Sequence, residues 1–197
     1  MKPIESCLVQ VATAQAGYFT TRQARDCGYS YALLSHHSAT GRFVRARRGI
    51  YRLRDHPSSQ HEDVMAAWLA AGPEAIVSHE SALDILGAGD SIPNRVNLTV
   101  PRSKRGSRRA RGVVVHTSEQ LPDADDVVLR NGMRVTAPVR TIMDVARAGL
   151  GPDLVSNAAK QIINRGLATG DQMRSAANLQ GGRVWRIIRD LLAEGAP

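Results

Sequence analysis

The chain has 197 residues, enough for one large domain or two small ones. It carries 26 Lys and Arg against 18 Asp and Glu, a formal net charge of +8. No apolar run approaches the roughly 20 residues of a membrane-spanning helix. Glu5 and Gln10 interrupt the N-terminal apolar stretch. We therefore expect a cytoplasmic protein that has neither a membrane anchor nor a secretion signal.

Positive charge is concentrated in two stretches of the sequence. Residues 1–56 carry a net charge of +6 and residues 101–112 another +6, whereas residues 57–100 between them carry −5. Two separate basic stretches favour contact with a polyanion more than a generally basic composition would.

The chain contains two cysteines, Cys7 and Cys27. Their spacing fits no metal-binding or redox motif. We therefore expect both to be reduced and to pack as small core residues, as is usual in cytosolic proteins.

The first quarter of the chain predicts a helix–turn–helix followed by a basic β-hairpin. Thr20 and Gln23 have the spacing of a capping box at the start of a short helix. Ser30 can cap a second helix, over residues 31–40. Residues 42–53, Arg-Phe-Val-Arg-Ala-Arg-Arg-Gly-Ile-Tyr-Arg-Leu, predict two short strands on either side of an Arg-Gly turn. Helix, turn, helix and basic hairpin in this order are typical of a winged helix.

The helix over residues 31–40 is the one expected to enter a DNA major groove. Its Leu33 and Leu34 are expected to face the core, which leaves Tyr31, Ser35 and His36 outward as base-reading candidates. The alternative is a solvated helical hairpin whose arginines only keep the protein soluble. Topology and charge agree, which favours DNA binding. The phosphate-contacting candidates are Thr20, Thr21, Arg22, Arg42, Arg45, Arg47, Arg48 and Arg52.

The remainder of the chain predicts a second domain of the α+β class. We expect a small, mainly antiparallel sheet with helices gathered on it. Residues 95–100 alternate as a strand whose partner is expected at 113–115, and Asn131-Gly132 predicts a two-residue hairpin turn. We place the boundary after residue 56, which gives a winged helix-turn-helix domain over 1–56 and an α+β domain over 57–197.

Helical periodicity places several helices in this second domain. Ser78 is expected to cap one of them, and Ser59 and Glu62 have the spacing of a capping box before another. Arg140 and Asp144, one turn apart, predict a surface ion pair. The helices are expected over residues 60–71, 79–86, 152–165, 171–179 and 183–194, with one more beginning near residue 138.

Residues 101–112 predict an exposed basic loop between two strands. Six cations in twelve residues, with no apolar side chain larger than alanine or proline, cannot pack into a core. The loop could bind DNA, RNA or an acidic protein surface; the alternative is a loop with no partner. Its cations are Arg102, Lys104, Arg105, Arg108, Arg109 and Arg111.

The sequence lacks the motifs of several enzyme classes. It has neither a Gly-x-x-x-x-Gly-Lys-Ser/Thr phosphate loop nor a Gly-x-Ser-x-Gly nucleophile elbow. His79-Glu80 begins like a zinc-protease motif, but Leu83 stands where the second histidine ligand would be. Ser81 and Asp84 could lie beside them on one helix, but helix capping and exposure to solvent are enough to explain why these residues are polar. We therefore expect no catalytic residues, no metal and no cofactor.

Several segments resemble the AbiEi family of antitoxins from bacterial toxin–antitoxin systems. The resemblance implies a winged-helix N-terminal domain that binds inverted repeats in the promoter of its own operon and represses it, an arrangement that suits a dimer. It also implies a C-terminal domain that counters a toxin with a nucleotidyltransferase-like fold, so the basic loop would contact DNA or that toxin. The resembling segments are residues 17–24 (Gly-Tyr-Phe-Thr-Thr-Arg-Gln-Ala), 47–53, 78–83 (Ser-His-Glu-Ser-Ala-Leu), 96–101 and 138–142.

Two other interpretations of the sequence stay open. One is a stand-alone transcription regulator whose second domain senses a ligand or forms a dimer, with no toxin involved. The other is an enzyme, either a nuclease or one that modifies the toxin covalently.

Overall fold

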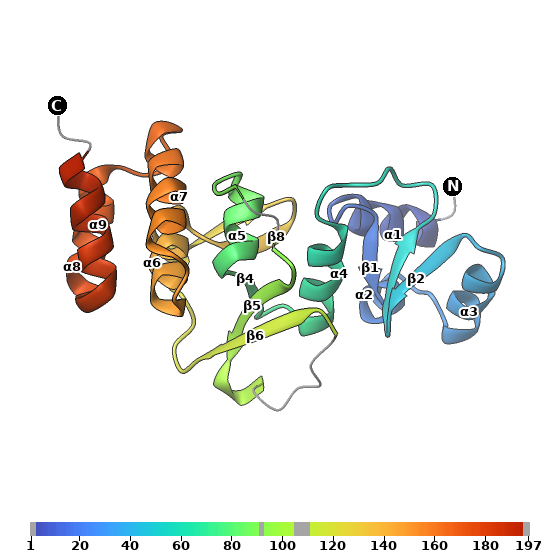
Figure 1. The fold of residues 1–197 in the computed structure, drawn as a ribbon. Helices are drawn as coiled ribbons and strands as arrows, with labels where there is room; N and C mark the ends of the chain where they lie inside the picture. The colour runs from blue at the N-terminus through green and yellow to red at the C-terminus, as the bar shows by residue number, and fades with distance from the viewer. Residues whose placement is uncertain (1–2, 91–92, 105–110, 195–197) are drawn as a thin grey trace. The chain divides into compact units, whose positions relative to one another are not determined.

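The fold is described from a computed structural model that covers residues 3–90, 93–104 and 111–194 (Figure 1). The chain forms two compact units. The first unit comprises Met1–Ala75 together with Leu129–Met133, and the second comprises Ile76–Val128 and Arg134–Pro197. The fold is of the α+β class, with a winged helix in the first unit, as the sequence predicts.

The first unit is built around a three-stranded antiparallel sheet in the order β1-β3-β2. Helix α4 packs with this sheet, although the sequence places its residues in the second domain. The compact units divide after Ala75, whereas the sequence places a domain boundary after residue 56. The boundary after residue 56 stays a prediction. The elements are α1 (Pro3–Thr13), β1 (Tyr18–Thr20), α2 (Thr21–Asp26), α3 (Tyr31–Ala39), β2 (Phe43–Arg47), β3 (Ile50–Leu53) and α4 (Glu62–Ala71).

Local capping explains where α2 and α3 begin. The Gln23 amide donates to Thr20 Oγ1 at 3.0 Å while the Thr20 amide donates to the Gln23 side chain at 2.8 Å, which confirms the predicted capping box. The Leu33 amide donates to Ser30 Oγ at 3.1 Å, so Ser30 caps α3 as expected. Between the two helices Gly28 has a φ of +95°, a backbone conformation that other residues rarely adopt.

The core of the first unit is centred on the fully buried Phe19. Its ring meets Phe43 edge-on at 5.0 Å and stacks with Tyr51 at 5.8 Å between centroids. Leu8 from α1 and Leu34 from α3 are also fully buried in this cluster. Each of these large side chains contributes about 1.5–3 kcal/mol through burial. The core therefore holds both the sheet and the helix–turn–helix in place.

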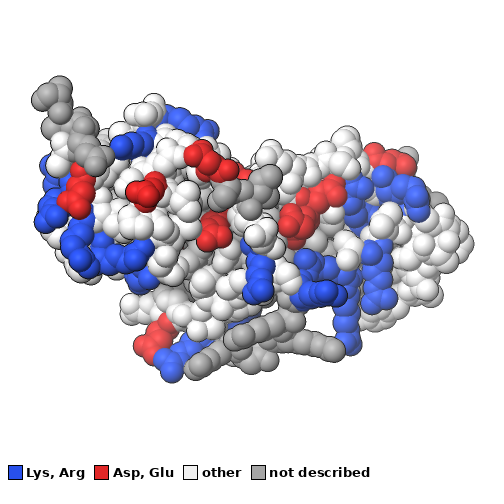
Figure 2. Space-filling view, in the orientation of Figure 1, with Lys and Arg blue, Asp and Glu red and all other residues white. Residues whose placement is uncertain are grey.

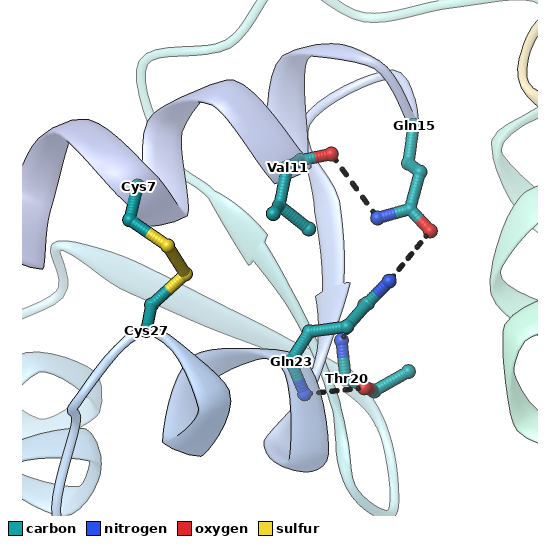
Figure 3. Close-up of a disulfide and its surroundings, with 6 residues drawn as sticks. All are labelled: Cys7, Val11, Gln15, Thr20, Gln23 and Cys27. Carbon is teal, nitrogen blue, oxygen red and sulfur yellow. Dashed lines mark hydrogen bonds between the residues drawn. A yellow bond between two sulfur atoms is a disulfide. The ribbon is translucent and has the colours of Figure 1, made fainter.

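Cys7 and Cys27 form a disulfide, so the expectation of two reduced thiols was wrong (Figure 3). Cys7 lies on α1 and Cys27 is the C-cap of α2, with their Cα atoms 5.6 Å apart. Spacing along the chain gave no sign of this, because the pairing arises from the packing of α1 against α2. Beside it, Gln23 Nε2 donates to Gln15 Oε1 at 3.0 Å, a second tie between the segment after α1 and α2.

The second unit contains most of a five-stranded sheet in the order β6-β5-β4-β8-β7; Leu129, Arg130 and Met133, at the turn between β7 and β8, are grouped with the first unit. Its strands are β4 (Ile76–Val77), β5 (Val96–Pro101), β6 (Val113–Ser118), β7 (Val127–Arg130) and β8 (Met133–Thr136). Its α-helices are α5 (His79–Leu86), α6 (Pro138–Ala148), α7 (Pro152–Asn164), α8 (Gly170–Gln180) and α9 (Gly182–Glu194), and two 3₁₀ turns cover Arg102–Lys104 and Ala124–Asp126.

The sheet of the second unit, expected to be mainly antiparallel, is mixed. The pairs β5–β6 and β4–β8 run parallel, whereas β4–β5 runs antiparallel. Strand residues alone do not reveal direction when the connection between two strands is a long loop, as it is between β5 and β6. The predicted partnership of these two strands is confirmed, and so is the hairpin turn, where Asn131 and Gly132 have φ values of +51° and +77°.

Helices α6 to α9 share one apolar core. Ile142 on α6, Ile162 on α7, Met173 on α8 and Ile188 on α9 are completely buried in it. These residues lie on the apolar stripes that helical periodicity places inward. No helix in the described ranges has the combined length and apolar character needed to span a membrane.

Two predicted helix starts differ in detail from the structure. Helix α4 begins at Glu62, two residues later than expected; the Ser59 amide donates to Glu62 Oε1 at 3.1 Å, but the N-cap His61 makes no side-chain cap bond. Ser78 occupies the N-cap position of α5 without capping it. Its hydroxyl is engaged by Thr99 and His79 instead, through contacts between elements that the local sequence does not show.

Candidate DNA-binding surface

The helix–turn–helix is fixed at its turn by Tyr29. This residue is buried, and its amide donates to the Ala24 carbonyl of α2 at 2.9 Å. Its ring lies 5.9 Å from the rings of both His37 and Phe43. Burial, together with the nearby Arg42, lowers the pKa of His37. Tyr29 and His37 thus pack α3 against Phe43 of β2.

Helix α3 presents one face to the core and the opposite face to solvent. Leu34 is buried and Leu33 half-buried, as expected. Tyr31 is 63% exposed, and Ser35 and His36 are exposed as well. The three base-reading candidates therefore share the outer face of the helix, and all three are exposed to solvent.

Arg25, which sequence reasoning did not single out, lies against Tyr31. Its guanidinium carbon is 4.7 Å from the centroid of the Tyr31 ring, and Nη1 lies 3.2 Å from the phenol oxygen. The two residues are six apart and separated by the turn, so no helical or strand periodicity connects them. Their contact orients the ring at the start of the exposed face.

The hairpin of β2 and β3 is joined to α2 at its turn. The Thr21 amide and hydroxyl both donate to the Gly49 carbonyl, at 2.9 and 3.2 Å. The pairing register of β2 with β3 shifts between Arg45 and Arg47, which marks a bulge in β2. Arg45 and Arg48 are exposed and Arg47 is half-buried. In Figure 2 basic side chains gather over the region of these two strands.

Two arginines of the predicted phosphate-contacting set are engaged within the fold. Arg52 is only 14% exposed, forms an ion pair with Glu62 at 3.1 Å and donates to the His56 carbonyl at 2.6 Å. Arg42 pairs with Glu5 at 2.9 Å. We therefore assign Arg52 to the support of the hairpin and give Arg42 no part in the proposed surface.

Glu62 also accepts a hydrogen bond from Tyr18 at 3.1 Å. Burial, followed by the charge of Glu62, raises the pKa of Tyr18 to about 12.

The remaining candidates lie at the start of α2 and in the basic loop. Thr20 and Thr21 are half-buried and Arg22 is exposed at the start of α2. In the loop, Arg102 pairs with Glu119, Lys104 is half-buried and Arg111 is exposed. The other loop cations that we predicted, Arg105, Arg108 and Arg109, lie outside the described residues.

Comparison with known proteins identifies relatives of both units. Residues 8–54 match the model of a family described as "Transcriptional regulator, AbiEi antitoxin", and residues 75–194 match "AbiEi antitoxin C-terminal domain". The crystal structure of the RV2827C protein from Mycobacterium tuberculosis is similar over 98% of this chain and 77% of its own, with a TM-score of 0.59 and 15% sequence identity. At that identity the likeness shows a shared fold. No curated protein sequence matches the chain.

Proposed function

This chain belongs to the AbiEi family of antitoxins and transcriptional regulators, and from that premise we propose that it represses its own operon and neutralises a toxin encoded beside it. The first unit would bind DNA in the promoter and the second would counter the toxin. Both activities would take place in the cytoplasm.

The observation that carries the DNA-binding proposal is the exposed outer face of α3 beside the arginines of the hairpin. An α-helix with its side chains is about 10–12 Å across and fits a major groove about 12 Å wide. In such a complex Tyr31, Ser35 and His36 would face base edges. The start of α2 and the hairpin would contact phosphates through Arg22, Arg45, Arg47 and Arg48, together with the hydroxyls of Thr20 and Thr21.

The antitoxin proposal depends on the second unit. The family match over residues 75–194 supports it, and the resemblance of the sequence motifs favours a toxin with a nucleotidyltransferase-like fold. The proposed role is non-catalytic: direct binding would suffice to block a toxin. Co-expression with the neighbouring gene should then rescue growth and yield a complex that copurifies. An increase in the intact mass of the toxin would instead indicate an enzyme.

Fluorescence anisotropy with a duplex from the promoter tests the DNA-binding proposal. If about five phosphates are neutralised per protomer, log affinity should fall with log salt at a slope of about −4 to −5. Replacing Arg47 and Arg48 by alanine should weaken binding to the promoter and to a scrambled duplex alike. The matched control removes two exposed arginines of the second unit, Arg174 and Arg186, and should leave affinity nearly unchanged. Normal binding by the Arg47 and Arg48 variant would remove the hairpin from the mechanism.

A further inference from the structure

The second unit contains a polar cavity of about 290 Å³ that the proposed function does not use. Side chains from α5, β5, β6 and α6 converge on it, and every residue that lines it belongs to this unit. A larger hollow of about 640 Å³ shares Arg140 and Arg147 with it. Pockets of about 300–1,000 Å³ hold small molecules in other proteins.

His79 lines the cavity and has a positive φ, a backbone conformation that is uncommon for residues other than glycine. Its φ is +54°, which costs a residue other than glycine about 1 kcal/mol or more and persists only where the surroundings impose it. The Thr99 hydroxyl donates to Ser78 Oγ at 2.8 Å, and Ser78 Oγ lies 2.9 Å from His79 Nδ1. Because Ser78 Oγ already accepts from Thr99, its own proton is available to Nδ1; in that tautomer the ring proton of His79 is on Nε2 and can donate into the cavity.

The second imidazole of the cavity, that of His116, lies flat against the first. The ring centroids are 3.6 Å apart, and His116 Nε2 bonds to Asn97 Oδ1 at 3.0 Å. Burial, followed by the charges of His116 and Arg147, lowers the pKa of His79 to about 3. Burial also lowers the pKa of His116. Both rings are thus neutral at ordinary pH and serve as polar walls rather than as charges.

The two guanidinium groups of the cavity differ in their partners. Arg140 donates to Asp144 at 3.0 Å and to Asp126 at 2.8 Å, so its charge is already compensated. Asp144 is 7% exposed, so the predicted surface ion pair is in fact buried. Arg147, two turns further along α6, donates to the neutral Gln180 side chain at 2.5 Å. Within the described part of the chain no carboxylate pairs with Arg147.

This arrangement has the chemistry of an oxyanion site. It combines the Arg147 guanidinium, which has no carboxylate within ion-pair distance among the described residues, with one imidazole N–H. The carboxylate that lines the cavity, that of Asp144, is paired with Arg140. Among the described residues, no group of three or more His, Cys, Asp or Glu side chains is placed to hold a metal ion. Arginine forms bidentate, charge-assisted hydrogen bonds with phosphate oxygens.

We propose that the cavity binds a small molecule through a phosphate group, held by the Arg147 guanidinium and by the Nε2–H of His79. The cavity is several times larger than a phosphate group and therefore leaves room for an organic remainder. Such a site would make the second unit responsive to a metabolite, in addition to its proposed contact with a toxin.

Imidazole signals in NMR spectra of the full chain test this proposal, with inorganic phosphate as the probe at constant ionic strength. Phosphate at millimolar concentration should shift the ring signals of His79 and His116 saturably; their assignment follows from the loss of a signal in H79N and H116N. Asn is chosen at position 79 because it tolerates positive φ. In R147Q the apparent affinity should fall about tenfold or more, the usual worth of a charge-assisted hydrogen bond.

The matched control is R174Q, which removes an arginine that is exposed on α8 and paired with Asp171; it should titrate like the wild type. R147K, which keeps the charge, should bind with intermediate affinity. Equal titration of R147Q and the wild type would overturn the proposal. So would the absence of saturable shifts, shifts confined to the histidines of the first unit, or a stronger response to acetate than to phosphate. Promoter binding by R147Q should be unaffected, which separates this result from the proposed function.

Discussion

The rings of His79 and His116 stack with their centroids 3.6 Å apart and their planes within 11° of parallel. One ring comes from the first residue of α5 and the other from β6. Two imidazoles at this distance would repel each other if both were protonated, because like charges in a buried environment interact strongly. The stack therefore depends on the neutral state of both rings.

We predict that acidification destabilises the fold through His79. Its pKa in the folded state, about 3, lies below the ordinary value of 6.5, so the unfolded chain binds the extra proton first. The stability contributed by the neutral ring is present above pH 6.5 and is lost as the pH falls toward 3. The slope should approach about 1.4 kcal/mol per pH unit in this window. Urea unfolding at several pH values checks this, and a wild-type slope equal to that of H79N would contradict it.

Removal of the Arg140 guanidinium should destabilise the second unit strongly. R140Q leaves the buried Asp144 carboxylate without its charged partner, at a cost of about 3–5 kcal/mol. Burial raises the pKa of Asp144 despite the opposing effect of Arg140, so the carboxylate is already unfavourable where it lies. The double variant R140Q/D144N should recover much of the loss in urea unfolding. Additive losses in the two single variants would show that the pair is not coupled.

The disulfide should stabilise the first unit by about 3 kcal/mol, the value expected for a closed loop of this length. The two cysteines are 20 residues apart. Unfolding of the wild type should therefore shift to lower denaturant when a dithiol reductant is present. C7S/C27S provides the control, because it should unfold at the same denaturant concentration as the reduced wild type, whether or not reductant is present. No shift on reduction would mean that packing alone holds α1 against α2.

Substitutions on the outer face of α3 should change discrimination more than affinity for DNA in general. S35A or H36A should reduce the ratio of promoter to scrambled-duplex affinity, because each base contact is worth about 1–3 kcal/mol of discrimination. R45A should instead weaken both complexes by a similar factor. Parallel anisotropy titrations at one salt concentration give these ratios. An unchanged ratio in both α3 variants would place base reading elsewhere.

The parts of the fold that the sequence predicts well are those with local causes. The capping box at Thr20, the Ser30 cap and the Asn131-Gly132 turn each depend on residues within a few positions of one another. The starts and ends of most helices follow from the same kind of signal. Exposure of Tyr31, Ser35 and His36 was predictable because the periodicity of α3 assigns its apolar residues to the other face.

The features that escaped prediction are contacts between distant segments. The Cys7–Cys27 bond, the pairing of Arg52 with Glu62 and the contact of Arg25 with Tyr31 all depend on how elements pack. The cavity of the second unit is a further example, since His79 and His116 meet only through the sheet. The Ser-His dipeptide at residues 78–79 is visible in the sequence, but nothing local shows that Ser78 would orient the imidazole instead of capping the helix.

Thr21 binds the Gly49 carbonyl through both its amide and its hydroxyl, which makes the start of α2 and the turn of the hairpin a single rigid piece. The exposed side chains of Ser35 and His36 take no part in that piece. In the proposed mode of DNA binding, a lineage of such proteins could acquire new target sequences by exchanging these outward residues, while the segment proposed to contact the DNA backbone is inherited unchanged.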